Sequence, residues 1–134
     1  TQPPCLGRVA GERREVRGQP DRHAAGDAVL RQLADLLKRA SRVEDLVFRY
    51  GGEEFAAVLP NATARAAAQI ADRIRNLVEK YTFLWENRTI PVTLSIGAAS
   101  LNGGESDSQR LIQAADAALY QAKQSGRNRV VVAR

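Results

Sequence analysis

Apolar residues spaced three or four positions apart predict three helices along this chain. The first covers residues 26–40, the second roughly 63–81 and the third about 108–125. Each carries a stripe of Leu, Ile, Val or Ala that would pack against a core. Asp27 lies near the start of the first helix, where a carboxylate is favourable. Gly126 is suited to the position just after the third helix.

Short apolar or alternating runs predict the strands between these helices. The predicted strands cover residues 46–48, 55–59, 83–85, 90–100 and 130–132. The first two flank Gly51 and Gly52 and therefore predict a β-hairpin. The stretch from Pro60 to Thr63 ends the second strand of the hairpin and caps the second helix. Helices interleaved with mostly antiparallel strands predict an α/β sandwich of two or three layers.

The first 22 residues follow neither period. They contain five Arg, three Gly and three Pro, so we expect an irregular segment over residues 1–22 and the folded domain over residues 23–134. The run from Cys5 to Ala10 is a poor candidate for a central strand. A missing central strand would leave a groove in the sheet.

Length and composition narrow the class of protein. A chain of 134 residues fits one domain, and no apolar run is long enough to span a bilayer. One Cys and one His exclude a Cys/His metal site, so carboxylates and phosphates would have to hold any metal, which favours Mg²⁺ or Mn²⁺. The net charge of +5 fits a nucleic-acid binder or an ordinary basic surface. Scattered arginines and few aromatic residues favour the ordinary surface, and the positive field also suits a nucleoside triphosphate.

The most informative candidate for a functional site is the tip of the hairpin. Gly51 and Gly52 allow a tight turn and let a ligand approach the backbone. The adjacent acids Glu53 and Glu54 could simply be solvent-exposed side chains at the tip of the hairpin. They could also hold a divalent cation that bridges phosphate oxygens.

Four blocks of the sequence resemble the GGDEF family of diguanylate cyclases. The run Arg49-Tyr50-Gly51-Gly52-Glu53-Glu54-Phe55 is similar to the defining family motif in its GGEEF form. The other blocks are His23 to Asp27, Val92 to Gly97 and Ala115 to Asn128, which resemble GHxxGD, VTxSIG and ADxALYxAKxxGRN. The resemblance implies a nucleotidyl-cyclase-like fold, in which helices flank a ferredoxin-like, mainly antiparallel sheet and the motif lies on a β-hairpin.

The family resemblance also implies an activity. Two GTP molecules would condense to cyclic di-GMP with release of two pyrophosphates, in a homodimer that uses Mg²⁺ or Mn²⁺. The full protein would carry an N-terminal sensor or receiver module and act in the cytoplasm. This domain would contact neither nucleic acid nor membrane.

The resemblance assigns roles to particular residues. It implies Glu53 and Glu54 as catalytic acids, with Glu53 also a metal ligand, and Asp27, Gly51, Gly52, Lys123 and Arg127 as substrate-binding residues. Asp27 would accept hydrogen bonds from the guanine edge. Lys123 and Arg127 would bind the terminal phosphates. Their spacing of four predicts that they share one face of the helix end.

A second site is implied just before the hairpin. Arg42-Val43-Glu44-Asp45 matches the RxxD pattern that forms the inhibitory product-binding site of the family. Arg can bind a phosphate or a guanine edge with two hydrogen bonds, and Asp can accept from guanine N–H groups. Arg73 lies where the family often adds another arginine.

One family motif is absent. The segment DxDxFKxxND, which supplies a metal ligand, a phosphate-binding Lys and a guanine-binding Asn, is not found, and Arg22 replaces a family Gly. The chain is then either a fragment or a damaged reading frame, in which residues 1–22 are not the family's own sequence, or a diverged domain. Both explanations predict weak or absent GTP turnover. Two alternatives to the enzyme follow, a catalytically inactive cyclic di-GMP receptor and a structural dimerisation module or non-functional fragment.

Overall fold

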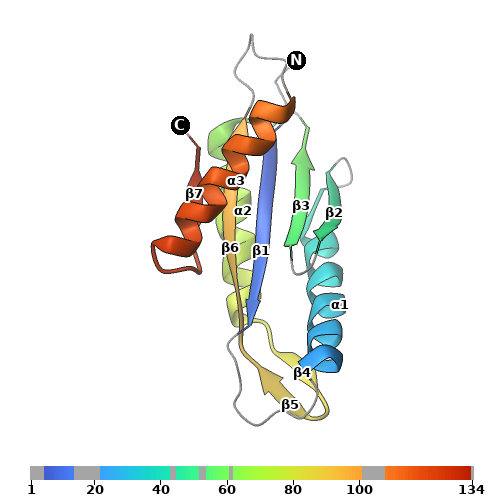
Figure 1. Ribbon diagram of the computed structural model, residues 1–134. Helices are drawn as coiled ribbons and strands as arrows, with labels where there is room; N and C mark the ends of the chain where they lie inside the picture. Colours follow the sequence, from blue (N-terminus) through green and yellow to red (C-terminus); the bar gives the residue numbers. More distant parts are fainter. Residues whose placement is uncertain are drawn as a thin grey trace.

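A computed structural model describes residues 5–13, 22–42, 45–51, 54–60, 62–100 and 108–133. Three helices and seven strands follow one another along these residues (Figure 1). In chain order they are β1 (Cys5–Arg13), α1 (Arg22–Ala40), β2 (Leu46–Gly51), β3 (Glu54–Leu59), α2 (Ala64–Lys80), β4 (Phe83–Trp85), β5 (Arg88–Ile90), β6 (Val92–Ser100), α3 (Ser108–Gln124) and β7 (Val130–Val132).

Five strands form one sheet in the order β2-β3-β1-β6-β7. All neighbouring strands are antiparallel except β6 and β7, which are parallel. Helix α3 covers one face of this sheet, and α1 and α2 share the opposite face (Figure 1). Strands β4 and β5 form a separate two-stranded ribbon. The predicted α/β sandwich with a mainly antiparallel sheet is therefore confirmed, with three layers.

Strand β1 corrects the expectation of an irregular N-terminal segment. Cys5–Arg13 is the central strand, antiparallel to β3 on one side and to β6 on the other. No groove is left in the sheet, because this strand fills the position. Helix α1 also begins at Arg22, before residue 23. The remainder of residues 1–21 lies outside the described residues, and the domain boundary at residue 23 stays a prediction.

The predicted helices and the hairpin are confirmed with small shifts at their ends. Thr63 is the N-cap of α2, where its hydroxyl accepts a hydrogen bond of 3.0 Å from the Ala66 N–H. The β4–β5 turn places Glu86 and Asn87 at positive φ, as a two-residue hairpin turn requires. Gln32 of α1 ties this ribbon to the helix layer, since its amide bonds both the N–H and the carbonyl of Leu84.

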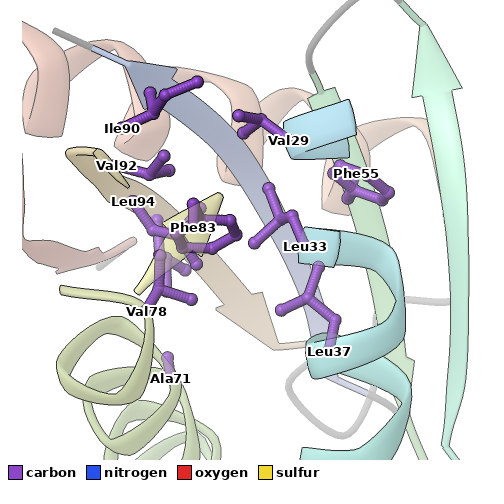
Figure 2. Close-up of a cluster of buried hydrophobic side chains, with 11 residues drawn as sticks. Val29, Leu33, Leu37, Phe55, Ala71, Val78, Phe83, Ile90, Val92 and Leu94 are labelled. Carbon is purple, nitrogen blue, oxygen red and sulfur yellow. The ribbon is translucent and has the colours of Figure 1, made fainter. Parts of the chain in front are cut away.

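The main core lies between the sheet and the α1–α2 layer (Figure 2). It gathers buried side chains from both helices, from the sheet and from the β4–β5 ribbon. Its members are Val29, Leu33, Leu37, Phe55, Ala71, Val78, Phe83, Ile90, Val92, Leu94 and Ile96. The core therefore fixes α1 against the strand that begins with Glu54 and Phe55.

Helix α3 lies unusually close to the opposite face of β6. A Cβ added to Gly97 would lie 2.2 Å from the Leu119 backbone nitrogen and 2.4 Å from the Ala115 carbonyl oxygen. Only glycine fits such an approach of backbone to backbone. Strand β6 is thus buried on both faces, and even Ser95 has no exposed side-chain surface.

Among the described residues, none of the helices combines the length and the apolar character needed to cross a bilayer.

Candidate nucleotide-binding site

A hollow opens between α1 and the β2–β3 hairpin. Its volume is about 490 Å³, within the range of ~300–1,000 Å³ typical of small-molecule sites. Asp27, the predicted guanine acceptor, lies exposed at this hollow. A separate cavity between α1, α2 and the sheet measures only about 40 Å³ and is almost wholly apolar. The hollow beside Asp27 is therefore the better candidate for a polar ligand.

Three cations share the hollow with Asp27, and the family resemblance implies a role for none of them. They are Arg31 and Lys38 of α1 and Arg49 of β2. With one acid among three bases, the hollow favours an anionic ligand. The spacing of Asp27, Arg31 and Lys38 by four and seven residues places them on one helix face, and this signal could have identified them.

Glu54 and Lys123 meet beside the hairpin. The Lys123 Nζ lies 3.5 Å from Glu54 Oε1, and both side chains are about one-third exposed. Successive residues of a strand point to opposite faces of the sheet. Phe55 packs in the core on the α1–α2 side and lines the hollow, whereas Glu54 meets Lys123 of α3.

The tip of the hairpin is described only in part. Gly51 ends β2 and pairs with Glu54, after a register shift between Arg49 and Gly51. Such a bulge bends the strand and increases its twist. Gly52 and Glu53 lie outside the described residues. Their predicted roles stay predictions.

The prediction that Lys123 and Arg127 share one helix face is wrong. Helix α3 ends at Gln124, and Gly126 follows at a φ of 126°. The Arg127 N–H then bonds the Ala122 carbonyl at 2.9 Å, as in a Schellman turn. Gly126 thus has the predicted helix-ending role, and Arg127 lies in the following loop with a φ of 64°.

The described residues do not assemble a carboxylate cage for a metal. Within the described ranges, no group of three or more His, Cys, Asp or Glu residues could hold an ion. The sheet register gives one cause of this absence. Ala10 of β1, which has no carboxylate, lies opposite Glu54 on one side and Ser95 on the other. When the family motif DxDxFKxxNDxxGHxxGD is aligned without a gap so that its last acid falls at Asp27, its first acid falls at Ala10.

The RxxD residues Arg42 and Asp45 bind each other. Asp45 accepts hydrogen bonds from the Arg42 backbone N–H at 2.9 Å and from its Nη2 at 3.0 Å. The Asp45 side chain is 1% exposed, against 38% for Arg42. Arg42 also donates to the Pro60 carbonyl at 3.3 Å, which links the turn before β2 to the end of β3. This pair therefore supports the hairpin as well as offering a guanidinium to solvent.

Arg73 lies near the same turn. It is exposed on α2, and its Nη2 is 3.5 Å from the Ala40 carbonyl, two residues before Arg42. The structure therefore brings Arg73 to the end of α1, beside the RxxD turn.

The exposed face of α1 carries a separate ion pair. The hydrogen bond from Arg39 lowers the pKa of the Asp35 carboxyl and raises that of the Arg39 guanidinium. Both side chains are more than half exposed, so this pair is a helix-surface contact.

Comparison with known sequences gives one family. The family described as Diguanylate cyclase, GGDEF domain matches residues 23–129. Diguanylate cyclase A of Treponema denticola is 44% identical over 112 residues, which cover 84% of this chain and 30% of that protein. Diguanylate cyclase DosC of Escherichia coli K12 is 48% identical over 109 residues, which cover 81% of this chain and 24% of that protein. The chain thus spans about a quarter to a third of these relatives.

Solved structures share the fold. The active GGEEF domain of a diguanylate cyclase from Vibrio cholerae superimposes with a TM-score of 0.86 at 32% identity, covering 99% of this chain and 84% of that chain. The GGDEF domain and coiled coil of DgcB from Caulobacter crescentus, in complex with c-di-GMP, gives 0.85 at 31% identity, covering 98% and 70%. Because so little of this chain is left out, β1 lies within the shared fold. The expected nucleotidyl-cyclase-like fold is confirmed.

Proposed function

Since the chain belongs to the GGDEF family of diguanylate cyclases, we propose that it binds GTP and condenses two GTP molecules to cyclic di-GMP as a homodimer. The observation that carries this proposal is the basic hollow beside Asp27, which adjoins the hairpin where Lys123 meets Glu54. The hollow suits a guanine nucleotide because it offers one carboxylate for the base, and its three cations attract an anionic ligand.

The proposed roles follow from residue chemistry. Asp27 accepts from the guanine N–H groups, while Gly51 and Gly52 leave room for the nucleotide. Lys123 and Arg127 bind the terminal phosphates. The 3′-hydroxyl of one GTP attacks the α-phosphorus of the other, pyrophosphate leaves, and the hydroxyl proton passes to the Glu53 carboxylate or to water.

Diguanylate cyclases of this family are generally dependent on a divalent metal. Glu53, with Glu54 beside it, is the proposed ligand for Mg²⁺ or Mn²⁺. Ala10 contributes no carboxylate at the β1 position opposite Glu54. We therefore expect weak metal binding and slow turnover in this chain.

Arg42, Asp45 and Arg73 form the proposed product site. The exposed guanidinium of Arg42, and Arg73 of α2, which reaches the end of α1, suit a phosphate and a guanine edge. We further propose that the full protein carries an N-terminal sensor or receiver module and acts in the cytoplasm, where GTP is supplied. Residues 23–134 remain the proposed family domain.

A catalytically inactive receptor for cyclic di-GMP is the second candidate. Ala10 favours it, because the RxxD residues remain while the first acid of the family's β1 motif is replaced by alanine. The receptor would bind cyclic di-GMP through Arg42 without making it.

One experiment separates the two candidates. The purified chain is incubated with GTP and Mg²⁺ or Mn²⁺, and cyclic di-GMP is measured by chromatography. Product that disappears in Glu53→Gln supports the enzyme. Absent product, with cyclic di-GMP binding that is lost in Arg42→Ala, supports the receptor. Arg88→Ala, an exposed arginine of β5, is the matched control. If the chain forms no product and binds no cyclic di-GMP, both candidates are overturned.

A further inference from the structure

The loop between α3 and β7 has a strained backbone. Gly126, Arg127 and Asn128 follow one another at φ values of 126°, 64° and 46°. Residues other than glycine seldom adopt this region, although asparagine does so more often than most. Surrounding contacts must therefore hold Arg127 and Asn128 in this conformation.

Helix α2 supplies those contacts through the Asn128 side chain. Arg75 Nη1 donates to Asn128 Oδ1 at 3.0 Å, and the Asn128 amide donates to Glu79. Arg75 is in turn held by Asp72, with Nε 2.9 Å from Oδ1, and lies 3.7 Å from Glu79 Oε2. The Arg75 side chain is only 18% exposed, so its geometry is well constrained.

The loop is also anchored on both sides of Arg127. The Arg127 N–H bonds the Ala122 carbonyl at 2.9 Å, and the Arg127 carbonyl accepts from Arg129 Nε at 3.0 Å. The Arg129 carbonyl then accepts from the Ile96 N–H at 2.9 Å. Helices α2 and α3 lie on opposite faces of the sheet (Figure 1), so the α2 contact reaches this loop around the β7 edge.

We propose that Arg75 is a positioning residue for triphosphate binding, acting through Asn128 to fix the backbone from which Arg127 projects. This inference rests on the proposed role of Arg127 as a phosphate ligand. Fixing the backbone in advance removes conformational freedom that the ligand would otherwise have to restrict. Arg75 itself need not touch the nucleotide.

The test compares ligands with and without terminal phosphates. Affinities are measured by calorimetry with Mg²⁺ for GMP and for an α,β-methylene analogue of GTP, which cannot release pyrophosphate. Arg127→Ala should weaken the triphosphate analogue about tenfold. Arg75→Ala should weaken it about fivefold, with GMP unchanged. The double variant should resemble Arg127→Ala alone, because Arg75 acts through Arg127.

Asn128→Gly isolates the network from other effects of Arg75. Glycine tolerates positive φ but removes both side-chain hydrogen bonds. It should reproduce Arg75→Ala, and Arg65→Ala, an exposed arginine elsewhere on α2, should change neither affinity. Equal losses for GMP and the triphosphate analogue, or additive effects of Arg75→Ala and Arg127→Ala, would overturn the inference.

Hydrogen exchange gives a second readout that does not depend on nucleotide binding. The Arg127 amide should exchange faster in Arg75→Ala and Asn128→Gly, while amides at the centre of β6 keep their protection. Unchanged exchange at Arg127 would contradict the positioning role even if the chain bound no GTP. Absent GTP binding together with faster Arg127 exchange would instead count against the proposed function alone.

Discussion

Lys123 of α3 lies 3.5 Å from Glu54 of β3, so the cation proposed for phosphate binding is paired with an acid of the hairpin motif. The two residues are far apart in the sequence and meet because α3 packs on the face of the sheet toward which Glu54 points. A triphosphate that contacts Lys123 would compete with Glu54 for the same ammonium group.

Removing the Lys123 charge should affect binding more than stability. The pair is about one-third exposed, so Lys123→Ala should change the free energy of unfolding by less than about 1 kcal/mol. Affinity for the α,β-methylene GTP analogue should fall about tenfold. Urea denaturation and calorimetry measure the two effects, with Lys80→Ala on α2 as the control. A large loss of stability with unchanged affinity would make Lys123 a structural residue.

Gly97→Ala should strongly destabilise the domain. The added methyl group would overlap the α3 backbone, so the helix would have to move away from β6. We expect a loss of about 3 kcal/mol or more in the free energy of unfolding, measured by urea denaturation. Thr93→Ala in the same strand should cost only about 1 kcal/mol. Similar losses in the two variants would mean that α3 adjusts easily.

Arg42→Ala should destabilise the domain even without nucleotide. It leaves the buried Asp45 carboxylate without its guanidinium partner, at a cost of about 1–3 kcal/mol. The double variant Arg42→Ala with Asp45→Ala should be more stable than Arg42→Ala alone, because no unpaired buried charge remains. Chemical denaturation of the ligand-free protein gives the comparison. Purely additive losses would show that the pair is not coupled.

Ala10→Asp should strengthen metal binding. It places a carboxylate at the β1 position opposite Glu54, as the family motif has it. Mn²⁺ should then raise the melting temperature by several degrees, because an ion that binds only the folded state stabilises it. Cyclic di-GMP formation should increase in the same variant. Ala10→Asn, which has the same shape without the charge, should show neither effect, and equal behaviour of both variants would contradict the prediction.

Helices and the hairpin were predictable because their apolar spacing matches the period of each element. Strand β1 was not, since Gly7, Arg8 and Gly11 interrupt any alternation. The strand forms because β3 and β6 offer backbone hydrogen bonds on both of its sides, and these bonds are independent of side-chain identity. Tertiary pairing thus outweighs local preference in this segment.

The site was predictable only where local spacing carries the information. The charges of Asp27 and Arg31 on one helix face follow from the helical period. The Glu54–Lys123 contact required the three-dimensional packing of α3 on the sheet. The relation of Lys123 to Arg127 was predicted incorrectly, because the turn at Gly126 ends the helix between them.

The central position of β1 has a consequence for how the chain acquires its fold. Ala10 pairs with Glu54 and with Ser95, so β1 is synthesised before both of its partner strands and must wait for them. Such non-local pairing slows folding. Until β3 has been made both edges of β1 have unpaired backbone groups, and one edge stays open until β6 has been made, so β1 could pair with other chains. Binding of this segment by a chaperone during synthesis would therefore protect the chain at its most vulnerable stage.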